Sequence, residues 1–205
     1  MSFRVEDKYL LRNFNKIEIY RFLNDNKFTK KYFDRKINSI YLENKNFDMF
    51  NDSEEGICPR KKIRFRYYEN NLNLINIETK INSQEGKYKV SRSTNTKFLH
   101  ESEKKGYYDS QYGICYPIIM VSYVREYFQN DYFRITIDKD IFFSGYKNSY
   151  KKIREEFLIL EIKISKSLKI PNFLEQLPID KLRYSKYCEG IKKIFHLSEN
   201  NKINF

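Results

Sequence analysis

Arginines, lysines and carboxylates alternate with other residues, mostly apolar, in several short segments of this chain. Because strand side chains alternate between two faces, each segment places its charges on one face and most of its apolar residues on the other. The segments are Arg4–Lys8, Arg64–Arg66, Glu78–Lys80, Lys87–Lys89, Tyr123–Arg125, Arg134–Asp138 and Glu161–Lys163. For any one segment, a sheet with one solvated face is the simpler interpretation. Closed into a barrel, however, this mostly cationic face would line a tunnel suited to a chain of phosphates.

These residue types suit phosphoryl transfer. That reaction needs alignment of donor and acceptor and neutralisation of charge on the transferring group, with little covalent help. Arginine forks bind phosphate oxygens at two points, and lysines act as compact charges. A carboxylate that holds Mg²⁺ or Mn²⁺ adds a Lewis acid bridging phosphate oxygens. Glu161 and Lys163 lie on one face of the same predicted strand and would supply both elements.

The elements that carry these residues are mainly strands, and the sequence predicts an α+β protein. We expect strands over 3–11, 37–43, 60–69, 73–81, 87–92, 117–127, 132–138 and 157–165. Asn70-Asn71 indicates a tight hairpin turn. Helices are expected over 15–24, 171–177 and 185–195, and loops or loop-plus-helix connections over 93–113 and 144–152.

Length and charge bound the possible partners. The 205 residues predict a single domain over 1–205, with a mobile polar tail over 196–205. The balance of 39 Lys and Arg against 27 Asp and Glu gives a net charge of +12. This charge favours a polyanionic partner: nucleic acid, inorganic phosphates or an anionic membrane surface.

The cysteines and the missing motifs exclude several classes of protein. Cys58, Cys115 and Cys188 are far apart, which argues against a zinc site and favours a reducing compartment. No apolar run has the length of a membrane span and no signal peptide opens the chain, so we expect a cytoplasmic protein. Neither a P-loop, nor a Rossmann fingerprint, nor a GxSxG elbow occurs.

The charged segments also follow a known order. The motifs are Arg4-Val5-Glu6-Asp7-Lys8-Tyr9, Ser39-Ile40-Tyr41, Lys62-Ile63-Arg64-Phe65-Arg66-Tyr67-Tyr68, Glu78-Thr79-Lys80, Tyr123-Val124-Arg125, Arg134-Ile135-Thr136-Ile137-Asp138, Leu160-Glu161-Ile162-Lys163 and Ser185-Lys186-Tyr187. Together they resemble the vacuolar transporter chaperone (VTC) domain, the polyphosphate polymerase branch of the triphosphate tunnel metalloenzymes. The resemblance covers nearly the whole chain, from Arg4 to about Ile194.

The resemblance implies a closed antiparallel tunnel barrel of about eight strands with a few flanking helices. It also implies transfer of the terminal phosphate of a nucleoside triphosphate, such as ATP, to inorganic polyphosphate or pyrophosphate, with Mn²⁺ or Mg²⁺ as cofactor. By position in the motifs, Glu161 resembles the metal-binding carboxylate, with Glu6 as a candidate second ligand. The cations that the resemblance implies for catalysis are Arg64, Arg66, Lys80, Arg125, Arg134 and Lys186. Those expected to bind substrate are Lys8, Lys89, Lys163, Arg64 and Arg66.

The chain departs from the family pattern at two positions. The hydrolytic branch typically opens with Glu-x-Glu-x-Lys, whereas this chain has Arg4 at the first of those positions, which favours the polymerase branch. Glu43 stands where the pattern has Asp, and this departure carries no clear functional consequence. The choice between Lys89 and Lys87 stays open, because both side chains point to the same face.

Three functions remain in competition. The first is a polyphosphate polymerase, and the second is a hydrolase of triphosphate or short polyphosphate on the same scaffold. The third is a protein without activity, either a tunnel that binds polyphosphate or a basic protein that binds nucleic acid. A purely structural interpretation of Glu78 and Glu161, as partners of neighbouring Lys or Arg, also stays open. Specific nucleic-acid binding ranks last, because most aromatic residues near the charged strands point away from the charged face, namely Phe65, Tyr67, Tyr88 and Phe133. Tyr123 and Tyr127 are exceptions, since they share the face of Arg125. A membrane-associated partner protein is compatible with the resemblance.

Overall fold

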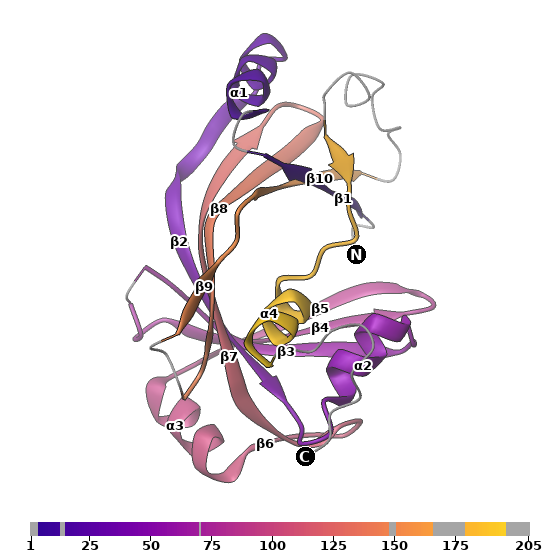
Figure 1. Ribbon diagram of the computed structural model, residues 1–205, viewed down its shortest axis with the longest axis vertical. Coiled ribbons are helices and arrows are strands. Elements are labelled where there is room, and N and C mark those ends of the chain that lie inside the picture. The colour runs from indigo at the N-terminus through magenta and orange to yellow at the C-terminus, as the bar shows by residue number, and fades with distance from the viewer. Residues whose placement is uncertain (1–3, 13–14, 70, 148–150, 166–178, 196–205) are drawn as a thin grey trace. The chain divides into compact units, whose positions relative to one another are not determined.

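A computed structural model describes residues 4–12, 15–69, 71–147, 151–165 and 179–195 of the chain. Its helices are α1 (Lys16–Asp25), α2 (Asp48–Glu55), α3 (Thr96–Lys105) and α4 (Lys186–Phe195) (Figure 1). Its strands are β1 (Arg4–Leu11), β2 (Thr29–Glu43), β3 (Arg60–Tyr68), β4 (Ile75–Ser83), β5 (Gly86–Thr94), β6 (Tyr107–Asp109), β7 (Gly113–Gln129), β8 (Phe133–Gly145), β9 (Lys152–Arg154), β10 (Leu158–Ser165) and β11 (Asp180–Lys181). The predicted α+β, mostly antiparallel class is confirmed.

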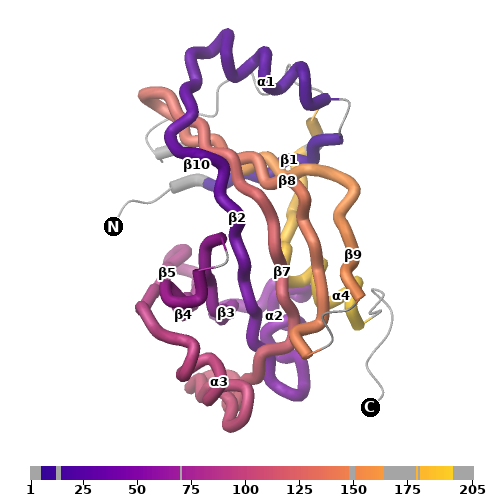
Figure 2. Tube along the Cα trace, turned by 90° about the vertical axis from the view of Figure 1, so that its left-hand side faces the viewer, coloured from indigo at the N-terminus to yellow at the C-terminus, as the bar shows by residue number. Residues whose placement is uncertain are grey.

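The strands form one sheet in the order β11-β1-β10-β8-β7-β2-β3-β4-β5, with β6 paired to β7 and β9 to β8. The long strands β8, β7 and β2 run side by side (Figure 2). Among the described residues, β11 and β5 end the hydrogen-bonded order, so the expected barrel is not closed by hydrogen bonds. At one end of the order, β11 has only two residues, which pair with Tyr9 and Leu10 of β1.

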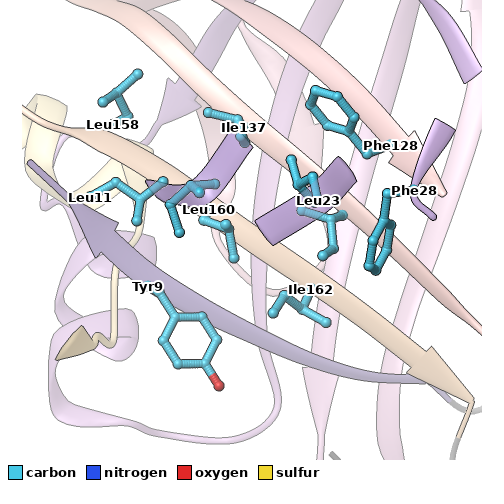
Figure 3. Close-up of a cluster of buried hydrophobic side chains, with 11 residues drawn as sticks. Tyr9, Leu11, Leu23, Phe28, Phe128, Ile137, Leu158, Leu160 and Ile162 are labelled. Carbon is cyan, nitrogen blue, oxygen red and sulfur yellow. The ribbon is translucent and has the colours of Figure 1, made fainter. Parts of the chain in front are cut away.

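The chain divides into two compact units. The first unit comprises Met1–Lys36, Tyr123–Ile141 and Arg154–Tyr184, and the second comprises Ile37–Ser122, Phe142–Ile153 and Ser185–Phe205. The core of the first unit takes one face of β1, β8 and β10 together with α1 (Figure 3). Its buried side chains are Tyr9, Leu11, Ile19, Leu23, Phe28, Phe128, Ile135, Ile137, Leu158, Leu160 and Ile162. The apolar residues alternate with the charged ones, as the two-residue period predicts.

In the second unit, β3 and β4 bury the face of the sheet that lies opposite their charged face. Ile63 and Phe65 are almost fully buried, and the Phe65 ring packs edge-on against Phe98, with ring centres 6.0 Å apart. Helix α4 approaches the sheet closely at Gly190. A Cβ atom there would lie 2.8 Å from Ile119, so only glycine allows this approach without a shift. The close contact fixes the height of α4 over the sheet and therefore the position of its first residues.

Most predicted elements are present. Strand β2 begins eight residues before the predicted position 37, and α2 was not predicted. β3 and β4 pair antiparallel as the predicted hairpin requires, although Asn70 itself lies outside the described residues. The predicted helix over 171–177 and the tail over 196–205 also lie outside them. Within the described part of the chain, no helix combines the length and apolar character that crossing a membrane demands.

Candidate functional site

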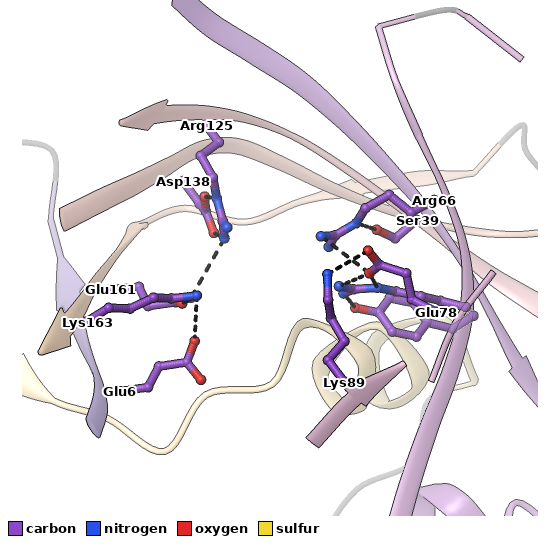
Figure 4. A network of polar contacts seen from close by, with 11 residues as sticks. Glu6, Ser39, Arg66, Glu78, Lys89, Arg125, Asp138, Glu161 and Lys163 are labelled. Carbon is purple, nitrogen blue, oxygen red and sulfur yellow. Dashed lines mark hydrogen bonds and ion pairs between the residues drawn. The ribbon is translucent and has the colours of Figure 1, made fainter. Parts of the chain in front are cut away.

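Strands β3, β4 and β5 of the second unit carry a charged group that we call the Glu78 cluster (Arg64, Arg66, Glu78 and Lys89). Arg64 lies opposite Glu78 in the strand register. Its Nε and Nη2 atoms donate to Oε2 of Glu78 at 2.9 and 2.6 Å. Lys89 Nζ donates to Oε1 of Glu78 at 3.0 Å (Figure 4). Nη1 of Arg66 lies 3.6 Å from the same carboxylate. Three cations share one carboxylate, so the Glu78 cluster keeps a net positive charge.

The neighbouring arginines dominate the electrostatics of Glu78. Burial alone would raise the pKa of Glu78, but the Arg64 and Arg66 guanidinium groups outweigh burial and lower the pKa to about 2. The same two arginines lower the pKa of Tyr41 against the effect of its burial, and Arg64 Nη1 donates to the Tyr41 hydroxyl at 2.9 Å. This face is therefore strongly electropositive even with Glu78 ionised.

We predict that Glu78 ties the stability of the fold to pH. Its pKa is lower in the folded state than the ordinary value of 4.5, so its contribution is complete above pH 4.5 and is lost as pH falls towards 2. Wild-type protein should therefore lose more unfolding free energy across that window than Glu78→Gln. Urea titrations at several pH values would measure this difference, and parallel pH profiles for the two proteins would contradict it.

Lys62 extends the charged face of the second unit towards helix α4. It lies opposite Lys80, which in turn lies opposite Lys89. Lys62 Nζ donates to Ser185 Oγ at 2.8 Å and lies 5.3 Å from the centre of the Tyr187 ring. Burial is the main reason why the pKa of Lys62 is lowered. Among the described residues no carboxylate contacts Lys62, so its charge is available to an incoming anion.

Glu43, at the end of β2, ties α2 and α4 to this face. Its carboxylate accepts hydrogen bonds from the backbone N–H groups of Asn44, Met49 and Phe50 at 2.9, 3.2 and 3.0 Å, and from the Tyr187 hydroxyl. Burial raises the pKa of Glu43 to about 7, against the effect of those hydrogen bonds. Helix α2 has no cap bond from its own N-cap side chain, so Glu43 serves as its cap. The departure from Asp at position 43 thus has a structural role.

The first unit carries a second charged group, the Glu161 cluster (Glu6, Arg125, Asp138, Glu161 and Lys163). Lys163 Nζ lies 2.9 Å from Glu161 and 3.1 Å from Glu6 (Figure 4). Arg125 forms a two-point pair with Asp138, and its Nη2 atom lies 3.7 Å from Glu161. Burial would raise the pKa of Glu161, but a hydrogen bond with Glu6 and the charges of Arg125 and Lys163 outweigh burial and hold the pKa well below its usual range.

The donors of the Glu161 cluster can be tested against a divalent cation. Within the described residues, no group of three His, Cys, Asp or Glu side chains is placed to hold a metal ion. Mg²⁺ at phosphate-transfer sites needs only one or two carboxylates, because water and substrate phosphates supply its other ligands. Glu161 and Glu6 therefore fit a cation shared with a bound phosphate, although they do not fit a metal held by protein alone.

The structure places the predicted site residues in two groups, each within one unit. Arg64, Arg66 and Lys89 surround Glu78, and Lys80 and Lys186 belong to the same unit. Lys163, Glu6 and Arg125 surround Glu161 in the other. Convergence of both groups on one interior surface stays a prediction.

The other predicted residues take defined positions near these groups. Lys89, and not Lys87, contacts Glu78, whereas Lys87 lies opposite Asn82. Lys8 lies opposite Glu161, and its Nζ atom donates to the backbone carbonyl of Tyr184 at 2.7 Å. Arg134 is exposed and lies opposite Lys163, and Lys186 is buried at the start of α4.

Sequence reasoning gave no role to Lys62 or Asp138, although both lie inside the quoted motifs. Lys62 is an even number of residues from Arg64 and Arg66 on the same strand, so the sequence alone places its side chain on the charged face. Asp138 shares the parity of Arg134, but its pairing with Arg125 depends on a contact between neighbouring strands. Parity identifies the face of each residue, whereas the pairing requires the structure.

A bound polyanion should stabilise the fold, because each unit holds several cations close together. At a tripolyphosphate concentration 100 times the dissociation constant, linkage adds about 2.7 kcal/mol, which corresponds to a melting-temperature rise of roughly 5–10 °C. The rise should be larger at low ionic strength. Thermal melts with tripolyphosphate at two salt concentrations would measure it, and no shift at low salt would count against an anion site.

Comparison with known proteins identifies the family of the chain. The sequence pattern of the VTC domain matches residues 3–195, so the chain belongs to the VTC domain family. This membership supports a function related to polyphosphate or to triphosphate binding. No curated protein sequence is significantly similar to the chain.

Solved structures share the fold at low sequence identity. The PH1819 protein of Pyrococcus horikoshii OT3 is 16% identical, with a TM-score of 0.56 over 93% of this chain and 99% of that one. A Bacillus halodurans protein whose name suggests an adenylate cyclase is 12% identical, with a TM-score of 0.54 over 99% of this chain and 95% of that one. At these identities the likeness concerns the fold alone.

Proposed function

We propose that this protein is a metal-dependent polyphosphate polymerase that transfers the terminal phosphate of a nucleoside triphosphate, ATP in the first instance, to a polyphosphate chain. The observation that carries the proposal is the Glu78 cluster, in which two arginines and a lysine share a single buried carboxylate inside a VTC domain. A site of this charge favours an anion with several negative groups.

The proposed roles follow from the contacts of each residue. Arg64 and Arg66 bind non-bridging phosphate oxygens with planar forks that Glu78 holds in place. Lys62, Lys80, Lys89 and Lys186 provide compact charges, which neutralise phosphates without fixing one register of the chain. Tyr41, through its contact with Arg64, limits the movement of that guanidinium.

The Glu161 cluster supplies the second part of the proposal. Glu161, with Glu6, would hold the Mn²⁺ or Mg²⁺ ion, whose chemistry is the neutralisation of charge on phosphate oxygens. Lys163 pairs with both carboxylates, and its charge and that of Lys8 favour the ionised form of Glu161. Arg125 and Arg134 bind phosphate oxygens beside them. Alignment and charge neutralisation are the main contributions that protein makes to phosphoryl transfer.

Two other functions use the same residues. A hydrolase would replace the acceptor chain by water, and a binding protein would hold polyphosphate without reaction. Purified protein incubated with ATP and Mn²⁺ separates the three functions when ADP, free phosphate and polyphosphate are resolved. Polymer together with ADP supports the polymerase, free phosphate with ADP supports the hydrolase, and unchanged ATP leaves binding alone.

A further inference from the structure

We propose that Asp138 is a positioning residue, which orients Arg125 and selects the edge of its guanidinium that meets a phosphate oxygen. The inference rests on the proposed function, in which Arg125 binds phosphate. It assigns a role to a carboxylate that is neither a metal ligand nor a substrate contact in that proposal. Three features of the Glu161 cluster lead to it.

The first feature is the geometry of the pair. Arg125 Nε donates to Oδ1 of Asp138 at 2.5 Å, and Nη2 donates to Oδ2 at 2.7 Å. Two parallel charge-assisted hydrogen bonds fix the plane of a guanidinium as well as its distance. Asp138 therefore holds the Nε–Nη2 edge of Arg125.

The second feature is the burial of Asp138, whose exposed fraction is 0%. A substrate cannot contact a fully buried carboxylate without moving its neighbours. Asp138 lies on the charged face of β8, two residues from Thr136, and both of its carboxylate oxygens accept hydrogen bonds from Arg125. Through this pair, Asp138 can act on a bound phosphate without touching it.

The third feature is the edge of the Arg125 guanidinium that Asp138 does not hold. Nη1 has no hydrogen-bond partner among the described residues, and Nη2 lies 3.7 Å from Oε2 of Glu161. The end-on edge, formed by Nη1 and Nη2, is thus the one left for an anion. A phosphate oxygen on that edge lies next to Glu161, where the proposed metal ion would neutralise its charge.

Positioning and simple charge make opposite predictions for Asp138→Asn. If only charge mattered, removing one negative group beside an anion site would tighten the binding of an anion. If Asp138 positions Arg125, the variant frees the guanidinium to turn towards Glu161 and the anion loses an oriented donor. Loss of one charge-assisted contact predicts tripolyphosphate binding about tenfold weaker, despite the gain in positive charge.

A matched control lies two residues along the same strand. Asp140 is exposed and pairs with Arg154 at 2.6 Å. Asp140→Asn also removes one negative charge from β8, and asparagine tolerates the positive φ of 50° at this position. It leaves the contact between Arg125 and Asp138 in place, so its affinity for tripolyphosphate should stay within about twofold of the wild-type value.

The test is calorimetric titration of tripolyphosphate, without metal, into wild type, Asp138→Asn and Asp140→Asn. Asp138→Asn and Asp140→Asn are each also measured in an Arg125→Lys background. Asp138→Asn should bind about tenfold more weakly than wild type, and it should add less than twofold in the Arg125→Lys background. Equal or tighter binding by Asp138→Asn, or a full tenfold loss in both backgrounds, would overturn the inference. Failure of wild-type protein to bind tripolyphosphate would instead contradict the proposed function, and the inference with it.

A measurement on wild-type protein covers the case in which Asp138→Asn does not fold. The Nε–H resonance of Arg125, assigned by its disappearance in Arg125→Lys, should exchange slowly with solvent and shift little when tripolyphosphate is added. The Nη resonances of the same residue should shift. An Nε–H signal that shifts as strongly as the Nη signals would show that phosphate takes the edge held by Asp138, which would refute the inference.

Discussion

Glu161→Gln is expected to lower metal-dependent turnover of ATP by about two orders of magnitude at saturating nucleotide and metal. The substitution keeps the shape of the side chain and removes one of the two carboxylates that fit a divalent cation. The estimate corresponds to the loss of one transition-state electrostatic contact. Tripolyphosphate binding without metal should survive or tighten slightly, because a negative charge leaves an anion site.

The control for this variant is Glu156→Gln, which removes an exposed carboxylate just before β10 and should keep wild-type turnover. Steady-state kinetics over a range of Mn²⁺ concentrations would separate the two variants. Wild-type turnover by Glu161→Gln under saturating conditions would show that the metal binds elsewhere.

Arg64→Ala is expected to weaken tripolyphosphate binding about 10- to 100-fold and to flatten its dependence on salt. Arg64 presents a planar fork next to Glu78, and a charge-assisted hydrogen bond contributes about 1.5–3 kcal/mol. Arg64→Lys keeps the charge and loses the fork. It should therefore bind more weakly than wild type while it keeps the steep salt dependence.

Arg92→Ala is the matched control for the charged face of the second unit. Arg92 is an exposed residue of β5 that lies opposite Ile77, which is buried. Both residues are on the face of the sheet opposite the charged one. Its removal subtracts the same charge without touching the Glu78 cluster. Titrations at several salt concentrations would compare the variants, and equal losses for Arg64→Ala and Arg92→Ala would mean that net charge alone governs binding.

The strands that carry the candidate site were predictable because one physical rule governs them. In β3, Ile63 and Phe65 are buried while Arg64 lies on the charged face, as the two-residue period requires. The charge pattern of Glu161 and Lys163 placed both on one face of β10 in the same way. Where charges and apolar residues alternate, sequence suffices to define the faces of a strand.

Elements without that alternation were missed. The first half of β2, from Thr29 to Lys36, is mostly exposed and polar on both faces, so no period marks it as a strand. Helix α2 is short and polar, and its cap comes from Glu43, which precedes the helix by several residues. A cap supplied from a neighbouring strand end leaves no signature within the helix itself.

The candidate site was predictable as a set of residues but not as a set of contacts. The motifs placed Arg64, Arg66 and Lys89 on one face, but not their sharing of a single carboxylate. The pair of Arg125 with Asp138 likewise depends on how two strands lie beside each other. Register between strands is a property of the fold, and the contacts follow from it.

The most direct test of the central claim is a crystal structure of the protein with tripolyphosphate and Mn²⁺. In the Glu78 cluster, the account predicts phosphate oxygens within hydrogen-bonding distance of Arg64 and Arg66. In the Glu161 cluster, it predicts a metal ion at Glu161 and a phosphate oxygen on the end-on edge of Arg125. Tripolyphosphate bound instead to surface lysines such as Lys151 and Lys152, with Arg64 and Arg125 making only their contacts to Glu78 and Asp138, would contradict it.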